Sequence, residues 1–477
     1  MTHLYDRQYI AGAWCAAQAQ DFVEVFDPNT GTLAAKVTVG HSDDAARAVK
    51  SAVRALDGWS ALALDERIQF VRKWAHALVK RQDLLVHAIA AEVGTPLKIS
   101  QIVQVESPLR NIENFIATAQ SLLWETSVGN SCIVREPFGV VACITPWNFP
   151  LHQIVLKLAP ALLAGNTVIL KPSELTPQTV QLISEALHES GFPDGVVNVV
   201  NGTGPIVGAA LAANEFVDMV SFTGSTEAGK AVTEIAARTV KKVATELGGK
   251  SPSVVLPSAD LGRAVKATVA SCTLNNGQTC SALTRLLVPV ELAEQAYALV
   301  QQEFAKLSVG SSVLEGSRVG PLISQRQKSN VLALLEEGKT QGAQPIGNAV
   351  VTPEQGFYVA PQAFAVTEDN ALAWKEIFGP VLSVLTYTDV DDAVRLANAS
   401  IYGLAAAVWG DEKDARTVAR RIRAGQVDIN GARFNALAPF GGYKQSGVGR
   451  ESGAFGLEEF LQIKSIQCNP SSILSGN

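Results

Sequence analysis

The sequence predicts an α/β fold with two parallel-sheet regions, and three observations support this prediction. From about Cys132 onward, short β-branched runs alternate with segments of helical periodicity, as in a parallel sheet covered by helices on both faces. A second alternating region begins near Ser253 and extends to about residue 440. The length of 477 residues corresponds to about three domain-sized units. The boundary between the two regions is predicted near Gly248-Gly249.

The elements of the first region can be assigned in order. Residues 43–125 carry apolar side chains at three- and four-residue spacing, which predicts helices. Runs rich in β-branched residues then predict four strands, over 139–144, 166–171, 196–200 and 217–222. Helices are predicted between and after these strands, over 151–164, from Thr176-Pro177, after the Gly-rich turn at 202–208, and from Thr226.

Composition and charge exclude several classes of protein. Hydrophobic residues make up 47% and charged residues 18%, as in ordinary globular proteins. No apolar run approaches the ~18 residues of a membrane span. The net charge of −6, without a basic stretch, argues against nucleic-acid or membrane partners. The N-terminus has no secretory signal pattern, and six irregularly spaced cysteines indicate reduced thiols. Together these features predict a cytoplasmic protein.

Three strand ends carry residues suited to a dinucleotide, because helix N-termini at such ends offer free N–H groups to phosphate. One is Gly202–Gly208, whose third glycine is one residue late for G-x-G-x-x-G, so that a plain tight turn is an equal alternative. Another is 222–226, a strand end with Gly224 and Ser225. The third, 171–174, offers a Lys and a Glu to ribose hydroxyls, with a solvated ion pair as the alternative.

Residues 224–230 also match the G-x-x-x-x-G-K part of a nucleotide-triphosphate loop. That loop needs a hydroxyl at the next position to bind Mg²⁺, and the chain has Ala231 there. The missing hydroxyl at Ala231 therefore argues against an NTPase.

One cysteine has the surroundings of a nucleophile. Cys280 lies in the small, polar, Gly-led turn 277–281, whereas Cys143 lies in an apolar strand and is expected to pack. The remaining cysteines do not lie in small, polar, Gly-led turns of this kind: Cys15, Cys132, Cys272 and Cys468. A free thiol with a pKa of about 8.5 is mostly protonated at neutral pH, so a catalytic cysteine needs positive charge or a helix dipole nearby. Glu246, before a Gly pair, offers a carboxylate at another strand end, although a surface Glu is the alternative.

Other catalytic patterns fail on spacing. The chain has no C-x-x-C or H-E-x-x-H, and its six histidines are scattered, so no metal site is expected. A G-x-S-x-G elbow is also absent. A Cys–His protease dyad stays open by pattern, but it does not explain a dinucleotide-type sheet.

Seven segments, taken in order, resemble the aldehyde dehydrogenase superfamily, and the resemblance extends over nearly the whole chain, roughly Tyr5 to Lys464. The segments are Ile144-Thr145-Pro146-Trp147-Asn148-Phe149-Pro150, Lys171-Pro172-Ser173-Glu174, Phe222-Thr223-Gly224-Ser225-Thr226, Glu246-Leu247-Gly248-Gly249-Lys250, Gly277-Gln278-Thr279-Cys280, Glu376-Ile377-Phe378-Gly379-Pro380 and Pro439-Phe440-Gly441-Gly442-Tyr443-Lys444-Gln445-Ser446-Gly447. The chain is most similar to the hydrolytic, non-acylating members that use NAD or NADP.

The resemblance implies a division of the chain into three parts. Residues 1–118 and 138–248 would form a Rossmann-like NAD-binding domain, and 249–445 an α/β catalytic domain. Residues 119–137 and 446–477 would form a small β arm for oligomerisation, in which the strand near 460–470 joins a partner's sheet. The expected assembly is a homodimer or homotetramer.

The resemblance also implies a mechanism for oxidising an aldehyde to its acid. Cys280 would attack the aldehyde carbon, and the Asn148 amide and the Cys280 N–H would stabilise the oxyanion. After hydride transfer to the nicotinamide, Glu246 would activate water to hydrolyse the thioester. Lys157 matches a position that helps relay the proton of Glu246, with snorkelling to solvent as the alternative.

The implied cofactor is NAD. Lys171 and Glu174 would bind the adenosine ribose, Ser225 the pyrophosphate, and Glu376 the nicotinamide ribose. The other expected cofactor contacts are Thr145, Trp147, Ser173, Gly204, Phe222, Gly224, Leu247 and Phe378. Glu174 would repel a 2′-phosphate, which favours NAD, although Lys171 leaves NADP possible.

By alignment with the family, the expected substrate tunnel is lined by Phe149, His152, Gln153, Leu156, Leu274, Thr279, Ser281 and Phe434. Several of these are small or polar, which suggests a roomy tunnel for a bulky, aryl or semialdehyde substrate. Arg285 and Arg433 are nearby in sequence, with structural or surface roles favoured over binding a substrate carboxylate. The alternatives are a thiol hydrolase or esterase without a redox role, a CoA-acylating semialdehyde dehydrogenase, and a binding protein that keeps only the fold.

Overall fold

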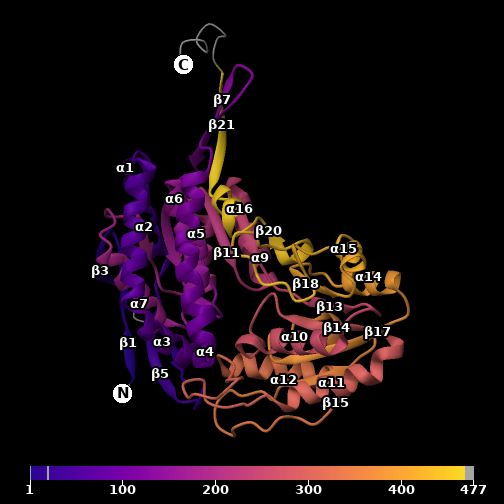
Figure 1. Cartoon of the computed structure of the whole chain (residues 1–477). Coiled ribbons are helices and arrows are strands. Elements are labelled where there is room, and N and C mark those ends of the chain that lie inside the picture. Colours follow the sequence, from indigo (N-terminus) through magenta and orange to yellow (C-terminus); the bar gives the residue numbers. More distant parts are fainter. Residues whose placement is uncertain (1, 19–20, 468–477) are drawn as a thin grey trace.

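The structure is a computed structural model that describes residues 2–18 and 21–467 (Figure 1). The indigo-to-magenta part of the chain forms one α/β body and the orange part a second, and a β arm projects from the first body. Cys468 and the end of the predicted segment 446–477 lie outside the described residues.

The predicted helical region contains five helices. They are α1 (Ser42–Ser60), α2 (Leu64–Val79), α3 (Gln82–Val93), α4 (Leu97–Ile99) and α5 (Ser107–Ser121). A π-helical turn, Ser100–Glu106, joins α4 to α5. The prediction for 43–125 is therefore confirmed as far as Ser121, and strand β6 (Glu125–Val128) begins shortly afterwards.

The first large sheet has eight strands in the order β20-β12-β11-β8-β9-β10-β2-β3. The five central strands are parallel: β12 (Lys242–Glu246), β11 (Met219–Thr223), β8 (Val140–Ile144), β9 (Thr167–Lys171) and β10 (Val197–Val199). Antiparallel strands close the edges: β20 (Gly447–Val448), β2 (Arg7–Ile10) and β3 (Ala13–Ala16). The four predicted strands are confirmed, with ends shifted by one or two residues.

Helices cover both faces of this sheet, as predicted. Successive side chains of β8 enter two different hydrophobic cores. Val141 and Cys143 belong to the core that includes α2 and α5, and Val140 and Ala142 belong to the core that includes α1. The helices that follow the strands are α6 (Pro150–Ala164), α7 (Pro177–Glu189), α8 (Ala209–Ala213) and α9 (Thr226–Ala236). The expected packing role of Cys143 is confirmed, since its side chain is fully buried.

The second large sheet has seven strands in the order β15-β16-β17-β14-β13-β18-β19. All but β15 run parallel: β13 (Ser251–Val255), β14 (Leu283–Pro289), β15 (Gln344–Ile346), β16 (Gln362–Ala365), β17 (Val381–Tyr387), β18 (Ala405–Trp409) and β19 (Gln426–Ile429). Its helices are α10 (Leu261–Thr273), α11 (Ala293–Ala305), α12 (Gln325–Thr340), α13 (Ala371–Trp374), α14 (Val390–Asn398) and α15 (Glu412–Ala419). The chain passes from the first sheet to the second between Glu246 and Ser251.

The β arm is a three-stranded sheet in which β7 (Ser131–Pro137) lies between β6 and β21 (Leu461–Gln467). Two expectations about 119–137 and 446–477 need correction. Residues 119–121 still belong to α5, and β20 lies in the eight-stranded sheet rather than in the arm. Strand β21 pairs with β7 of its own chain, after helix α16 (Gly453–Glu458).

A smaller sheet lies at the N-terminus and contains β1 (His3–Tyr5), β5 (Leu33–Thr38) and β4 (Phe22–Phe26). Within residues 2–18 and 21–467, no helix is both long and apolar enough to cross a membrane.

Candidate active site

A cleft of about 700 Å³ lies between the two α/β bodies, at the carboxyl ends of strands β8, β9, β11 and β12. Its walls carry Trp147 and Asn148, which follow β8, and Ser173 and Glu174, which follow β9. Further wall residues are Gly224 and Ser225 after β11, Leu247 and Gly248 after β12, and Cys280, Glu376 and Phe378 from the second body. Segments that are distant in the sequence therefore meet in one cavity.

The backbone before Cys280 adopts an unusual conformation. Asn275, Asn276 and Gly277 are consecutive residues with positive φ, at 51°, 62° and 76°. A Cβ atom on Gly277 would lie 2.2 Å from the Gly379 carbonyl, so only glycine fits there. This turn places Cys280 half-buried on the cleft wall.

The surroundings of the Cys280 thiol differ from the expectation. Burial, together with the negative charges of Glu246, Glu376 and Glu451, raises the pKa of the Cys280 thiol to about 12. The charged groups that influence this thiol are thus anionic rather than cationic. In the state described here, Cys280 is protonated at neutral pH.

Asn148 lies between β8 and α6 and is buried. Its side-chain Nδ2 donates a hydrogen bond of 3.0 Å to the carbonyl of Gln278, two residues before Cys280. An amide nitrogen has two N–H groups, so one is left for another acceptor.

Glu246 is the last residue of β12, and its side chain is buried. Neither carboxyl oxygen has a hydrogen-bond partner within the described chain. Burial raises the pKa of this carboxyl well above its usual range, Glu451 raises it further, and Lys157 and Arg450 lower it. The backbone at Gly441 packs against the carboxyl, because a Cβ there would lie 2.7 Å from Glu246 Oε1.

Lys157 is fully buried, which overturns the snorkelling alternative. Its Nζ lies 2.7 Å from Glu451 Oε1 and 3.2 Å from Ser221 Oγ. Lys157, Glu451 and Glu246 line the same small cavity, but Lys157 makes no direct hydrogen bond to Glu246. Glu451 makes no direct hydrogen bond to Glu246 either, although it acts on that carboxyl through its charge.

At the far end of the cleft, Lys171 Nζ lies 3.2 Å from Glu174 Oε2. Ser173 and Glu174 line the cleft, whereas Lys171 is buried behind them. Ser225 caps α9, since its Oγ accepts from Ala228 N at 3.3 Å. Three other predicted cofactor residues are not among the described lining residues: Thr145 is buried at the end of β8, Gly204 begins a π-helical turn, and Phe222 is buried in β11.

Glu376 lies where the two bodies meet. Its Oε1 accepts a hydrogen bond of 2.9 Å from Gly249 N, and burial raises the pKa of its carboxyl to about 7. A Cβ on Gly248 would lie 2.3 Å from Glu376 Oε2, so the glycine permits this approach. Phe378 has a positive φ of 55°, and its ring meets Trp147 edge-on with centroids 5.5 Å apart.

The predicted tunnel residues are only partly brought to this cleft. Gln153 lines it, and Thr279 and Ser281 flank Cys280 in sequence. The other members are not among the described lining residues of the cleft: Phe149, His152, Leu156, Leu274 and Phe434. The Phe149 and His152 rings are in contact, with centroids 6.4 Å apart, and Phe434 is 51% exposed.

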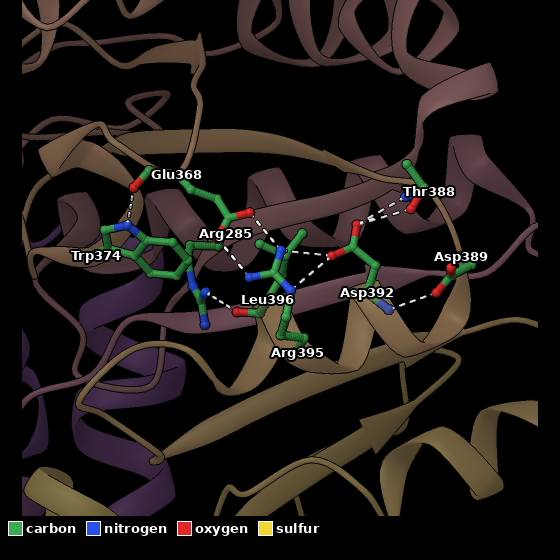
Figure 2. Close-up of polar contacts among 8 residues, drawn as sticks. All are labelled: Arg285, Glu368, Trp374, Thr388, Asp389, Asp392, Arg395 and Leu396. Carbon is green, nitrogen blue, oxygen red and sulfur yellow. Dashed lines mark hydrogen bonds and ion pairs between the residues drawn. The ribbon is translucent and has the colours of Figure 1, made fainter.

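Arg285 has a structural position (Figure 2). Its guanidinium is fully buried and donates to the carbonyls of Lys250, Leu396 and Ala397 at 2.7–2.9 Å. Figure 2 shows the bond to Leu396. It also lies over the Trp374 ring at 5.3 Å. The structural role favoured for Arg285 is therefore confirmed, and Arg433 is exposed.

Sequence reasoning missed several residues of the site. Glu451 has no motif linking it to Lys157, which lies 294 positions away. Gln327 lines the cleft from α12, and its Nε2 donates to the Phe378 carbonyl at 3.0 Å. Other missed lining residues are Ser324, Arg326, Asn330, Ala333 and Leu334. Ser324 is the N-cap of α12, and the preference of serine for this position is a signal that could have marked the start of the helix.

No group of three or more His, Cys, Asp or Glu side chains among the described residues is arranged to hold a metal ion. The geometry thus brings a half-buried thiol and an amide donor to one cleft of about 700 Å³, and a buried carboxyl to the small cavity lined by Lys157 and Glu451.

Comparison with known proteins gives consistent results. A family model described as Aldehyde dehydrogenase family matches residues 14–466. A 3-succinoylsemialdehyde-pyridine dehydrogenase from Pseudomonas sp. is 42% identical over 474 residues, covering 97% of this chain and 98% of the relative. A solved cysteine-to-alanine mutant of aldehyde dehydrogenase C from Pseudomonas syringae, in complex with NAD⁺ and octanal, has a TM-score of 0.95 at 42% identity and covers 97% of this chain and 96% of its own. The Mycobacterium tuberculosis aldehyde dehydrogenase in complex with NAD⁺ has a TM-score of 0.94 at 37% identity, with 98% and 99% covered.

Proposed function

The chain belongs to the aldehyde dehydrogenase family, and we propose that it oxidises an aldehyde to the free carboxylic acid with NAD as hydride acceptor, through a thioester on Cys280. The observation that carries this proposal is the meeting of Asn148, Glu174, Cys280 and Glu376 in one cleft, with the buried Glu246 next in sequence to the cleft residue Leu247. A nucleophile and a dinucleotide-sized space then share one cavity.

The residues of the cleft fit a dinucleotide. The N-terminus of α9 presents free N–H groups next to Gly224, where the missing side chain lets a phosphate approach. Glu174 offers an acceptor to a ribose hydroxyl and is paired from behind with the buried Lys171, and Glu376 offers a second acceptor in the same cleft as Cys280. When bound, NAD supplies the hydride acceptor. Glu174 favours an unphosphorylated ribose, so NAD is the proposed cofactor and NADP a weaker one.

Attack by Cys280 on the aldehyde carbon places negative charge on the former carbonyl oxygen. The free N–H of the Asn148 amide and the backbone N–H of Cys280 are the proposed donors to this oxyanion. Because Asn148 is already fixed by its bond to the Gln278 carbonyl, its second N–H needs little reorganisation. Removing one such donor typically lowers kcat by about 100- to 1000-fold.

Because its pKa is raised, the Cys280 thiol must give its proton to an acceptor before the sulfur can attack. Glu246 is the proposed acceptor, since its raised pKa brings it closer to that of a group that exchanges protons near neutral pH. The same residue is the proposed base that activates water against the thioester. The Glu451–Lys157 pair would then carry the proton away along the small cavity.

The proposed substrate is a bulky, aryl or semialdehyde compound. Gln153 lines the cleft, and Thr279 and Ser281 flank Cys280 in the sequence, so polar rather than aromatic side chains occupy these positions. The names of two relatives support aldehydes larger than acetaldehyde, because one is a semialdehyde-pyridine dehydrogenase and the other was solved with octanal. Acylation of CoA is disfavoured because Glu246 is present to activate water.

We also propose that the chain forms a homodimer or homotetramer through its β arm. Three apolar side chains there are largely exposed, Val128 at 65%, Ile463 at 71% and Ile466 at 46%. Surfaces of this kind are common at contacts between subunits. Sedimentation as a monomer at micromolar concentration would contradict the assembly.

The function is tested by mixing the enzyme with NAD and a panel of short alkanals, aryl aldehydes and semialdehydes. The proposal expects NADH and the free acid in equal amounts, without CoA, and no activity in Cys280→Ala. Ester hydrolysis without aldehyde-dependent NADH formation would instead identify a thiol hydrolase. Efficiency that is highest for acetaldehyde and falls with size would contradict the substrate class.

A further inference from the structure

A closed ring of hydrogen bonds lies behind the proposed oxyanion site. Gln104 Nε2 donates to Thr95 Oγ1 at 3.0 Å and to the backbone carbonyl of Asn148 at 2.9 Å. Thr95 Oγ1 donates to Asn275 Oδ1, and Asn275 Nδ2 completes the ring by donating to the same Asn148 carbonyl at 2.9 Å. Two paths of donation thus start at Gln104 Nε2 and converge on the Asn148 carbonyl, one directly and the other through Thr95 and Asn275.

The ring has almost no access to water. Thr95 and Gln104 are fully buried, and Asn275 is 1% exposed. Buried polar groups that lose a partner cannot turn to solvent, and hydrogen bonds in such a network strengthen one another. The three side chains are therefore held in a single arrangement.

The ring connects the two segments that supply the proposed oxyanion donors. Asn148 carries the side-chain donor, and Asn275 begins the left-handed turn that leads to Cys280. Asn275 Nδ2 also reaches the Gln278 carbonyl at 3.3 Å, the same atom to which the Asn148 amide donates. Consecutive non-glycine residues with positive φ persist only where their surroundings hold them.

Gln104 contributes to the ring from the π-helical turn Ser100–Glu106. Turns of this kind are rare and are frequently found at functional sites. Gln104 Oε1 has no hydrogen-bond partner within the described chain, so the side chain acts only as a double donor. A glutamate here would place carboxylate oxygens against the Thr95 hydroxyl and the Asn148 carbonyl. The Asn148 carbonyl has no hydrogen to donate, so that hydrogen bond would be lost.

We propose that Gln104 is a positioning residue for this enzyme: by donating to both Thr95 and Asn148, it holds the Asn148 amide in register with the turn that carries Cys280. The proposal rests on the proposed aldehyde oxidation. Gln104 acts through Asn148 and does not touch the substrate.

The first test compares Gln104→Met with the wild-type enzyme. Losing both donors should lower kcat/KM for the aldehyde by about 10- to 100-fold, since small misplacements at a reacting centre have effects of this size. Binding of NAD, measured by calorimetry, should change by less than about twofold because the ring lies away from the Glu174 end. Gln104→Glu should be at least as slow as Gln104→Met.

Gln101→Met is the matched control. Gln101 lies on the same π-helical turn, but it is exposed and donates only to Glu106 Oε1 at 3.1 Å. Its kcat/KM should stay at the wild-type value. An equal loss in Gln101→Met and Gln104→Met would overturn the proposal, because it would show a general disturbance of the turn.

A double-mutant cycle separates positioning from general loss of stability. In an Asn148→Ala background, Gln104→Met should lower kcat/KM by less than about threefold, because the donor it positions is already gone. Independent, multiplying effects would overturn the proposal. Thr95→Val, which breaks the ring elsewhere, should behave like Gln104→Met and provides a second variant if the first does not fold.

The outcome is distinct from the test of the proposed function. A wild-type enzyme without aldehyde-dependent NADH formation would refute the function. A wild-type enzyme that is active, with an equally active and folded Gln104→Met variant, would refute only the role of Gln104.

Discussion

The Lys157 ammonium lies 2.7 Å from the Glu451 carboxylate, in a buried ion pair beside the Glu246 carboxyl. The two side chains are 1% and 9% exposed, so the pair has little contact with solvent. Breaking a buried pair by removing one partner typically costs about 3–5 kcal/mol of stability. Both members of this pair act on the pKa of Glu246: Glu451 raises it and Lys157 lowers it.

Glu451→Gln should shift the pH dependence of kcat. Glu451 is an anion that raises the pKa of Glu246, so its removal lowers that pKa. A base works in its deprotonated form, and the rise of kcat with pH should therefore begin at lower pH in the variant. A pH–rate profile with a saturating aldehyde checks this, and a shift to higher pH would contradict the electrostatic role assigned to Glu451.

Glu246→Gln should separate the two halves of the proposed reaction. Thioester formation releases NADH before water is needed, so a burst of NADH should survive while steady-state turnover slows. Stopped-flow absorbance on the time scale of a single turnover measures both phases. Undiminished steady-state turnover would remove Glu246 from the mechanism.

The Cys280 thiol should react slowly with alkylating reagents in the absence of cofactor and substrate. Burial and three carboxylates hold its pKa near 12, so the reactive thiolate is scarce at neutral pH. Removing one like charge, as in Glu376→Gln, lowers that pKa and should speed up iodoacetamide labelling at pH 8. Labelling of the Cys280 peptide, followed by mass spectrometry, gives the rate. A slower rate in the variant would argue against the charge effect.

Glu174→Gln should improve the use of NADP relative to NAD. The substitution removes the carboxylate that we propose faces the adenosine ribose, and it leaves Lys171 without its ionic partner. One like charge near a phosphate is worth roughly 1 kcal/mol or more in water, so the kcat/KM ratio of NADP to NAD should rise by about fivefold or more. An unchanged ratio would place the ribose away from Glu174.

Much of the fold could be predicted because its signals are local. The strand runs at 139–144 and 166–171 and the helix entered at Thr176-Pro177 each depend on neighbouring residues, and the structure contains them. The arm was less predictable, since the assignment of Gly447–Val448 to the eight-stranded sheet depends on a pairing with β12 across the chain.

Some residues of the candidate site could likewise be found from the sequence around them, and others could not. Cys280, Glu246 and Asn148 lie in short segments whose order along the chain resembles that of a known family. Glu451 and Gln104 became visible only through contacts with residues far along the chain, such as Lys157 and Asn148. The carboxylates that act on the Cys280 thiol could not be predicted from the sequence, because burial and the approach of these groups are consequences of packing.

The most direct test of the central claim is an acid quench of Glu246→Gln mixed with NAD and an active aldehyde, followed by mass spectrometry of the peptides. The account predicts an acyl adduct on the Cys280 peptide, formed in step with the NADH burst and absent when NAD is omitted. NADH formation with no adduct on Cys280, or with the adduct on another cysteine, would contradict it.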